Sequence, residues 1–375
     1  MKDFSNVMNV AVYLDHNASA DLRPEARAAV ERALALGGNG SSVHRHGRRV
    51  RAEIESARDA VAELCGVDRD AVVFTSGGTE ANNQVVQGAS TRRVLVSAVE
   101  HPSVATVTPR AEVVPVNRDG VVDLAALGEM LSENGEGALV CIMAANNETG
   151  VVQPVAEAAE VVRRAGAILH CDAVQAPGKI DFDARTLGAH TYAVSGHKIG
   201  APAGVGALIA ADPSARPDAL IRGGGQERHH RSGTENLIGI AGFGAAAAAT
   251  ASAWREEAEH TRALRDELEQ RLGNRAEVAG ARAPRLPNTS NIILTGVESE
   301  TQVMALDLAG ISVSVGAACS SGKVRKSAVL DAMGYGEEEA GSAIRVSLGW
   351  NSTKSDIDAF VAEWSKLAER RPAAA

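Results

Sequence analysis

The sequence predicts an α/β protein with a largely parallel sheet and a second, smaller α/β lobe. Short apolar runs alternate with helical patterns between about residues 70 and 210, and the alternation resumes with shorter runs after about residue 240. Apolar strands that are joined through helices pair in parallel and are covered on both faces. The chain has 375 residues, of which 45% are hydrophobic, and this length allows two or three lobes with a sizeable core.

The first part of the chain is expected to supply the main sheet. Seven strands are expected, over residues 71–75, 94–98, 112–116, 138–144, 167–171, 191–195 and 205–210. A helical pattern over residues 155–165 separates two of these strands, and another helix begins at Ala81. Polar residues follow several of the strands directly, at the edge where open α/β sheets bind their ligands.

The second part of the chain begins with an alanine-rich stretch, residues 244–251, which leads into a charged amphipathic pattern over residues 254–272. This pattern predicts a long helix. The remaining expected elements are strands over residues 291–295, 311–315 and 343–348 and helices over residues 323–333 and 355–369. They predict the smaller α/β lobe.

The composition excludes several classes of function. The formal net charge of −9 argues against nucleic acid as a partner. The four cysteines lack the paired short spacing of a zinc site, and a chain of this size does not need a disulfide framework. We see no basic and apolar leader and no apolar run as long as a membrane span. We therefore expect a cytoplasmic protein with no membrane partner.

Cys319 lies in a run of very small residues, residues 314–322, between Gly316 and Gly322. Such a run has little apolar surface to bury, and its glycines allow backbone angles that other residues avoid. We expect an exposed thiol on a loop that can approach a reaction centre and withdraw from it. The alternative is a buried structural cysteine, since free cysteine is often buried.

A turn rich in glycine and hydroxyl groups, residues 75–80, follows one expected strand and precedes the helix that begins at Ala81. Free N–H groups and the positive end of the helix dipole at such a turn form a site for phosphate. A plain helix cap would have the same sequence, so the turn alone leaves both interpretations open.

Asp172 and Lys198 indicate the cofactor chemistry. Asp172 ends an apolar strand, and a carboxylate there can keep the nitrogen of an electron-withdrawing pyridine ring protonated. Lys198, which follows Ser195 and His197, supplies an amine for a Schiff base, and desolvation near other cations lowers a lysine pKa. The alternative is a helix-capping aspartate and a surface lysine. With Cys319, the pair predicts sulfur chemistry on an imine-forming cofactor.

Further motifs accompany these residues along nearly the whole chain. They are YLDHNA (13–18), GNGSSVH (38–44), TSGGTEANN (75–83), EH (100–101), NNETG (146–150), HCDAVQ (170–175), SGHK (195–198), GGGQER (223–228), RSGT (231–234), SVGAACSSG (314–322) and AIRVSLG (343–349). By these motifs the chain resembles the pyridoxal-phosphate-dependent cysteine desulfurases, the NifS/IscS-like group of the class-V aminotransferase family. Each motif alone is weakly specific, and the resemblance depends on all of them occurring in the same order as in that family.

The resemblance implies fold type I of the pyridoxal-phosphate enzymes. That fold has a large domain, with a mainly parallel mixed sheet flanked by helices, and a smaller α/β domain. We expect the large domain over residues 20–255. The small domain would comprise residues 1–19 and 256–375 and carry the cysteine loop. Pyridoxal 5'-phosphate is the implied cofactor, and a homodimer is the implied assembly.

The resemblance also implies roles around the cofactor. Lys198 would form the imine, Asp172 would hold the pyridinium and Gln175 would contact the phenolic oxygen. His101 would stack over the ring and shuttle protons, although His101 alone could equally be a satisfied core or helix-capping histidine. The phosphate would be bound by Gly78, Thr79, Ser195 and His197, with Thr234 reaching it from a second subunit.

Substrate residues are implied in the same way. Arg345 would pair bidentately with the carboxylate of L-cysteine, with Asn39 as a weaker helper and Asn147 near both cofactor and substrate. Arg345 alone could equally form a strand-edge salt bridge. The Cys319 thiolate would take the substrate sulfur as a persulfide, leaving L-alanine, and His101 would accept the thiol proton. The basic residues that follow, Lys323, Arg325 and Lys326, either favour the thiolate or form a solvated helix face.

The persulfide would pass to an acceptor protein, either an iron–sulfur scaffold or another sulfur carrier. Three rival interpretations remain. A class-V aminotransferase would have no use for Cys319, a selenocysteine lyase would differ little in its residues, and a non-catalytic scaffold would be expected to lack Lys198 or Asp172.

Overall fold

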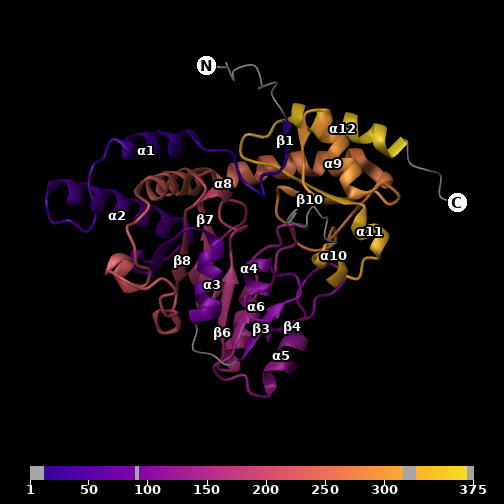
Figure 1. The fold of residues 1–375 in the computed structure, drawn as a ribbon. Coiled ribbons are helices and arrows are strands. Elements are labelled where there is room, and N and C mark those ends of the chain that lie inside the picture. The colour runs from indigo at the N-terminus through magenta and orange to yellow at the C-terminus, as the bar shows by residue number, and fades with distance from the viewer. Residues whose placement is uncertain (1–11, 89–92, 316–326, 370–375) are drawn as a thin grey trace.

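The computed structural model describes residues 12–88, 93–315 and 327–369. Figure 1 shows a central sheet with helices around it and a smaller group of strands and helices beside it, formed by the first described residues and the C-terminal part. The predicted α/β class, with a main sheet and a smaller lobe, is confirmed.

The central sheet has seven strands in the order β2-β8-β7-β6-β5-β3-β4. They are β2 (Val72–Thr75), β3 (Val94–Ser97), β4 (Glu112–Val114), β5 (Leu139–Cys141), β6 (Ile168–Asp172), β7 (Thr191–Ser195) and β8 (Gly206–Ala210). All the expected strands are present, most of them shorter than predicted. Neighbouring strands are parallel except around β8, which is antiparallel to β7 and β2. The connection from β7 to β8 contains only a short 3-10 helix, and a connection without a crossover helix favours antiparallel pairing.

Helices cover both faces of this sheet. One face packs on α3 (Gly78–Gly88) and α4 (Pro102–Ala105), with side chains such as Val85 and Val104 against Leu139. The other face packs on the larger cluster of helices: α2 (Arg45–Cys65), α5 (Leu124–Ser132), α6 (Val155–Arg164), α7 (Ala184–Leu187) and α8 (Leu237–Leu272). Aliphatic and alanine side chains fill this core, as the low aromatic content of 3% requires.

The alanine-rich stretch and the amphipathic pattern form one helix, α8, of 36 residues. Its first half is long and apolar enough to cross a membrane, with a mean hydropathy of 1.5, which contradicts the expectation that no run reaches that length. Half of that window is buried inside the protein, where α8 packs against α2 and against α1 (Pro24–Leu34). A helix that packs in the core of a protein passes the same test of length and hydropathy, because its small residues are apolar and also allow close packing against other helices.

The smaller group of elements has its own core. Strand β1 (Val12–Tyr13) pairs in parallel with β11 (Ile311–Ser312), and β12 (Ala343–Ser347), β10 (Thr289–Ile293) and β9 (Glu277–Val278) form an antiparallel sheet. The helices are α9 (Ser299–Leu308), α10 (Ala328–Ala332), α11 (Glu337–Gly341) and α12 (Lys354–Glu369). Leu14, Phe360 and Trp364 are fully buried there, and leucines on one face of the second half of α8 pack into the same core. The expected domain boundary at residue 255 therefore lies inside α8 and stays a prediction.

A strained turn follows the central sheet. Glu227, Arg228 and His229, in the 3-10 helix η5 (Gln226–His229), have φ values of 45°, 55° and 68°. A buried ion pair holds this left-handed backbone, because Arg58 meets both carboxylate oxygens of Glu227 at 2.7 Å, and Phe74 N donates to the same carboxylate. Left-handed angles are costly for residues with a side chain, so this pair stabilises the turn.

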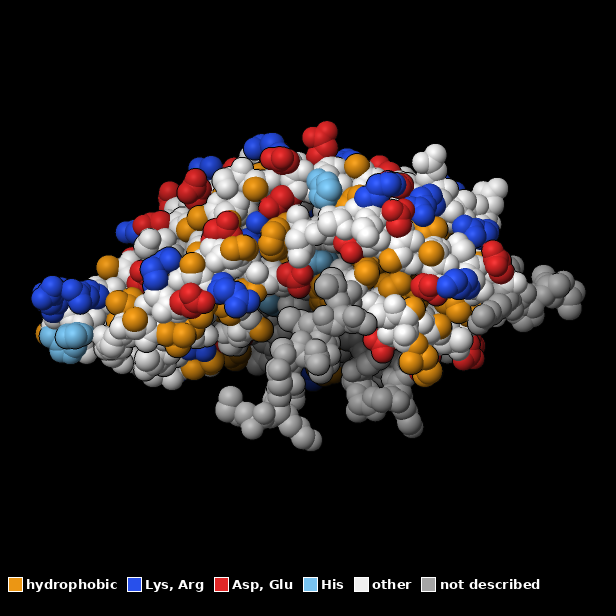
Figure 2. All heavy atoms as spheres, turned by 90° about the horizontal axis from the view of Figure 1, so that it is seen from above, with side chains coloured by type: hydrophobic (Ala, Val, Ile, Leu, Met, Phe, Trp, Pro, Cys, Tyr) orange, Lys and Arg blue, Asp and Glu red, His pale blue; other side chains and the backbone are white. Residues whose placement is uncertain are grey.

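Charges of both signs are interspersed over the face seen in Figure 2, so no single-sign field covers it. A group of basic side chains and histidine stands at the end of the molecule where α1 and α2 meet. The exposed residues of that loop and of the first turns of α2 include His44, Arg45, His46, Arg48 and Arg49.

Candidate active site

A cavity of about 360 Å³ lies at the carboxyl ends of the central strands. Because β6 and β7 are parallel neighbours, Asp172 and Ser195 end at the same edge of the sheet. The 3-10 helix η3 (Gly196–Lys198) follows β7 at once and brings the next two side chains to the cavity. The predicted site residues that line it are Gly78, Thr79, His101, Asn147, Asp172, Gln175, Ser195, His197, Lys198 and Arg345.

Asp172 is buried and accepts two hydrogen bonds from the protein. Its Oδ2 accepts from Asn82 Nδ2 at 2.8 Å, and its Oδ1 accepts from the backbone N–H of Val174 at 3.0 Å. Each carboxylate oxygen has a second lone pair, so the group can accept one more donor from the cavity. The bond to Val174 is local, yet the side chain lines the cavity instead of only capping a turn.

Lys198 lines the same cavity, and its amine has a lowered pKa. Its Nζ donates to the backbone oxygens of Asn17 at 2.5 Å and of Ala18 at 2.9 Å. Burial and then the Arg345 cation lower the pKa of Lys198 to about 8, against the opposing effect of Asp172. The unprotonated amine that a nucleophilic lysine requires is therefore a minority form at pH 7, but a far more accessible one than for an ordinary lysine.

His101 combines the two interpretations that the sequence left open, since it caps a helix and also lines the cavity. Its Nδ1 accepts the backbone N–H of Ser103 at 3.1 Å at the start of α4 and lies 2.8 Å from the Ser103 hydroxyl. Burial lowers the pKa of His101, and the Lys198 cation lowers it further, while Asp172 acts in the opposite direction.

The N-terminus of α3 forms one wall of the cavity. Gly78 begins the helix, and a Cβ at this position would lie 2.5 Å from Val174 Cγ2, so only glycine allows this approach. Thr79, Ser195 and His197 lie beside it on the cavity wall. Burial and neighbouring lysines lower the pKa of His197 to about 4, so its ring is neutral and can donate a hydrogen bond.

Gln175 is held by two polar neighbours. Its Oε1 accepts from Lys179 Nζ at 2.5 Å, and its Nε2 donates to the backbone oxygen of Asn17 at 3.0 Å. An amide nitrogen carries two hydrogens, so one hydrogen of Gln175 is left for a ligand. Lys179 also donates to Asn17 Oδ1 at 3.1 Å, which fixes this corner of the site.

The sequence left two roles open for Arg345, a strand-edge salt bridge and binding of a substrate carboxylate, and its position is compatible with both. It lies on β12, an edge strand, and forms an ion pair with Asp15 Oδ1 at 2.6 Å. A second N–H donates to the backbone oxygen of Asn147 at 3.0 Å, whereas Nε is buried and has no partner among the described residues. Arg345 lines the cavity, and each of its two terminal nitrogens carries a second hydrogen beyond the one bonded to Asn147 or Asp15.

Two predicted residues, Asn39 and Thr234, do not line this cavity, and a third lies outside the described residues. Asn39 lies in the loop between α1 and α2, where its side chain accepts the backbone N–H of Ser41. Thr234 lines a different, smaller pocket beside Glu227. Cys319 lies outside the described residues, as do Lys323, Arg325 and Lys326.

Several residues that line the cavity were not predicted to take part. The polar ones are Asn17, Asn82, Ser103 and Ser314. A signal existed for Asn82, because it lies four residues after Gly78 and so shares its helix face. No local signal existed for Asn17, which reaches Thr289 and Asn288 across the fold.

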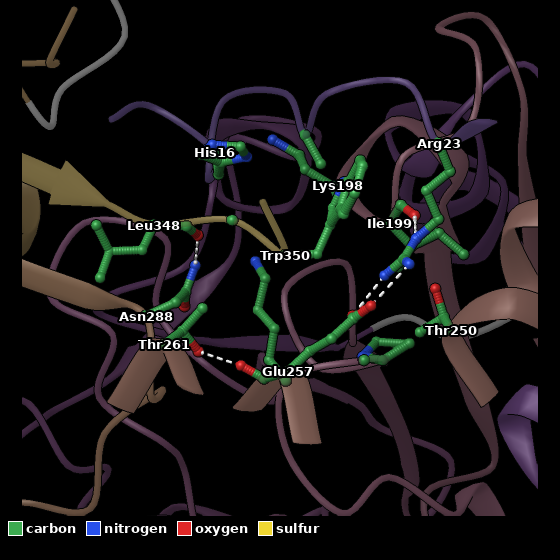
Figure 3. Close-up of a pocket in the computed structure, with 15 residues that line it drawn as sticks. His16, Arg23, Lys198, Ile199, Thr250, Glu257, Thr261, Asn288, Leu348 and Trp350 are labelled. Atoms are coloured by element: carbon green, nitrogen blue, oxygen red, sulfur yellow. Dashed lines mark hydrogen bonds and ion pairs between the residues drawn. The ribbon is translucent and has the colours of Figure 1, made fainter. Parts of the chain in front are cut away.

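Lys198 also lines a second cavity on its far side, of about 40 Å³. Figure 3 shows His16, Thr250 and Trp350 around it, with Arg23 bonded to both carboxylate oxygens of Glu257. Neither Asp172 nor His101 lines this space. Its volume suits a few water molecules, so it is a space behind the site and not a cofactor site.

Comparisons with known proteins agree with this geometry. The chain matches the family model described as aminotransferase class-V over residues 12–360. A cysteine desulfurase from Cereibacter sphaeroides is 43% identical over 368 residues, covering 92% of this chain and 93% of the relative. The cysteine desulfurase IscS 1 from Archaeoglobus fulgidus is 39% identical, covering 89% of this chain and 90% of the relative.

Solved structures give the same result. A NifS-like protein from Rickettsia africae matches with a TM-score of 0.88 at 34% identity, covering 96% of this chain and 99% of that one. SspA, solved in complex with cysteine, matches with a TM-score of 0.77 at 25% identity, covering 91% and 99%. The resemblance carried by the motifs is confirmed: the chain belongs to the aminotransferase class-V family, and its relatives there include NifS-like and IscS-like cysteine desulfurases.

Proposed function

We propose that this protein is a pyridoxal-phosphate-dependent cysteine desulfurase that receives the sulfur of L-cysteine on Cys319. In this reaction the C–S bond of the substrate breaks and an S–S bond forms. L-cysteine and the Cys319 thiol become L-alanine and a Cys319 persulfide, with no external oxidant or reductant. The observation that carries the proposal is one cavity that joins Asp172, Lys198 and Arg345.

The residues of the cavity suit this cofactor. The α3 N-terminus with Thr79 and Ser195 offers donors for a phosphate, and Asp172 offers a buried carboxylate with free lone pairs for a pyridinium nitrogen. The remaining hydrogen of Gln175 suits the phenolic oxygen. The cavity volume of about 360 Å³ is within the usual range for small ligands. When bound, the cofactor supplies an electron sink for the charge left after loss of the α-proton.

Lys198 would hold the cofactor through Nζ, and the same nitrogen would accept the α-proton of the substrate. The carbonyl oxygens of Asn17 and Ala18 orient this amine, and its lowered pKa provides the unprotonated form. Arg345 binds the substrate carboxylate through the remaining hydrogens of its two terminal nitrogens, and Asn147 borders the same space. These contacts orient the substrate above the cofactor.

Cys319 is the candidate nucleophile because the other cysteines are poor ones. Cys65, Cys141 and Cys171 are buried, and burial raises the pKa of each thiol, that of Cys65 to about 12. Ser314 lines the cavity, and Cys319 follows it by five residues. Five extended residues span at most about 18 Å. The thiol is therefore within reach of a substrate bound beside Arg345.

The assembly and the partners are part of the proposal. Thr234 lies outside this cavity and exposed, as expected if it reaches the phosphate of a second copy in a homodimer. The persulfide passes to an acceptor protein of an iron–sulfur or other thiolation pathway in the cytoplasm.

The test uses the Cys319→Ala variant of the full chain with sulfur-labelled L-cysteine. The variant should keep the absorbance of the bound cofactor and its response to L-cysteine. It should form no persulfide and release little alanine in the presence of a reductant. In the unmodified chain, mass spectrometry should find one added sulfur on the peptide with Cys319. The matched control is Cys65→Ala, which removes a buried thiol and should leave the persulfide yield unchanged. Sulfide release at the original rate from Cys319→Ala would refute the assignment.

A further inference from the structure

A continuous chain of hydrogen bonds runs behind the cavity, from β7 to His101. His170 lies 2.9 Å from Thr191 Oγ1 through its Nδ1 and 2.9 Å from Asn82 Oδ1 through its Nε2. Asn82 Nδ2 is 2.8 Å from Ser103 Oγ, which is 2.8 Å from His101 Nδ1. His170 and Asn82 are buried, so these groups have few other partners available.

The orientation of the Asn82 amide sets the direction of this chain. Asn82 Nδ2 also lies 2.8 Å from Asp172 Oδ2, and a carboxylate oxygen at that distance requires a donor. The amide nitrogen therefore faces Asp172 and Ser103, and both of its hydrogens are used. The amide oxygen faces His170 and can only accept.

The protonated nitrogen of His170 follows from this orientation. Because Asn82 Oδ1 accepts, the hydrogen of His170 lies on Nε2. Burial lowers the pKa of His170 to about 4, so the ring is neutral and its Nδ1 carries no hydrogen. Nδ1 then accepts the hydroxyl hydrogen of Thr191.

The protonated nitrogen of His101 follows in the same way. Ser103 Oγ accepts from Asn82, so its single hydrogen is free to point at His101 Nδ1. The backbone N–H of Ser103 donates to the same Nδ1 at 3.1 Å, and a backbone N–H cannot reverse its role. A hydrogen on Nδ1 would face that N–H directly. The hydrogen of the neutral ring therefore lies on Nε2.

We propose that Ser103 and Asn82 are positioning residues that lock His101 in its Nε2–H form, so that His101 acts as a hydrogen-bond donor to negative charge on the substrate. A donor that is oriented beforehand stabilises charge as it develops, without reorganising. This role is opposite to the one expected from the sequence, in which His101 accepts the thiol proton, because Nε2 has no lone pair to offer. The part played in the reaction rests on the proposed function, whereas the position of the hydrogen does not.

The first test locates the hydrogens directly. The full chain is labelled with ¹⁵N-histidine, and NMR separates ring nitrogens that carry hydrogen from those that do not, with and without the cofactor. His101→Gln and His170→Gln identify the two sets of signals. We expect a protonated Nε2 and a bare Nδ1 in both rings at neutral pH. A hydrogen on His101 Nδ1 would overturn the proposal.

The second test separates positioning from simple packing. Ser103→Ala removes the hydroxyl donor and should shift the His101 Nδ1 signal and lower kcat about tenfold or more, with the KM for cysteine within about twofold. Ser103→Thr retains a hydroxyl and should restore both. Asn83→Ala is the matched control, since Asn83 is the next residue on α3, donates to backbone oxygens of Thr79 and Ser103 and accepts from the Gln87 side chain, and so has no bond to His101 or His170.

The outcomes distinguish the proposal about His101 from the proposed function of the enzyme. A shifted Nδ1 signal in Ser103→Ala with an unchanged kcat would overturn the donor role of His101. A drop in kcat that Ser103→Thr does not restore would show a packing effect and overturn the positioning role. Failure of the unmodified enzyme to release alanine would refute the proposed function alone, because the labelled histidine signals would still report the position of the hydrogen.

Discussion

Arg345 offers the sharpest prediction, because its bonded neighbours determine both the sign and the size of the effect. Its side chain is 4% exposed, one N–H group pairs with Asp15 and another with Asn147, and Nε is unused. Hydrogen bonds to charged groups contribute about 1.5 to 3 kcal/mol each. Two bonds to a substrate carboxylate are therefore worth about 3 to 6 kcal/mol, of which Asp15 offsets part by its negative charge.

The perturbation is Arg345→Gln, and the expected loss of affinity for L-cysteine is about 100-fold or more. Arg345→Lys keeps the charge but loses the planar guanidinium, so its affinity for L-cysteine should lie between those of the unmodified chain and Arg345→Gln. Asp15→Asn is the opposing control, since removing a carboxylate beside the guanidinium should leave affinity unchanged or improve it. Binding is measured spectroscopically in the Cys319→Ala background, where no turnover complicates the titration.

A second readout does not involve the substrate. The Arg345 cation is one cause of the lowered pKa of Lys198, after burial, so Arg345→Gln should raise that pKa above its value of about 8. The rate at which an amine reagent modifies Lys198 in the cofactor-free chain, followed against pH, reports this shift. If Arg345→Gln changed neither the cysteine affinity nor the pKa of Lys198, the assignment of Arg345 to the substrate carboxylate would be refuted.

Three other predictions concern the framework around the site. Gly78→Ala places a Cβ 2.5 Å from Val174 Cγ2 and should weaken cofactor binding tenfold or more, about 1.4 kcal/mol, with Val174→Ala restoring it in an absorbance titration. Glu227→Gln removes the bidentate carboxylate partner of buried Arg58, which keeps only its longer contact with Glu55 at 3.3 Å, and should lower the free energy of unfolding in urea by up to about 3 to 5 kcal/mol. His170 has a folded pKa of about 4, below its unfolded value, so the unfolded chain binds one more proton between about pH 6.5 and 4 and stability falls as pH falls through that window. His170→Gln should flatten the slope of stability against pH by up to about 1.4 kcal/mol per unit.

Each of these has a control in the same chain. Gly77→Ala should be tolerated, because a Cβ there meets no atom within 4 Å. Asp59→Asn breaks an exposed ion pair with Arg69 and should change stability far less than Glu227→Gln. For His170→Gln the control is the pH range above about 7.5, where His170 is neutral in the folded and the unfolded chain and the slope should not change. Equal effects of a variant and its control would contradict the corresponding prediction.

The amino-acid sequence determined the parts that depend on neighbours along the chain. Apolar runs with flanking turn residues predicted each strand of the main sheet, and the polar residues after strands, Asp172 and Ser195 among them, lie at the sheet edge as expected. These features follow from local propensity and chain direction, since parallel strands bring their carboxyl ends together.

Only the tertiary structure decided which side chains meet across the fold. The pairing of Arg345 with Asp15 joins residues 330 positions apart, and the bond from Asn82 to Asp172 spans 90. The packing of α8 against α1 and α2 depends in the same way on segments distant in the sequence. No local pattern encodes such contacts, because they arise when segments distant in sequence are buried against one another. The hydrogen on His101 Nε2 is of this kind, since a helix cap and a buried asparagine together decide it.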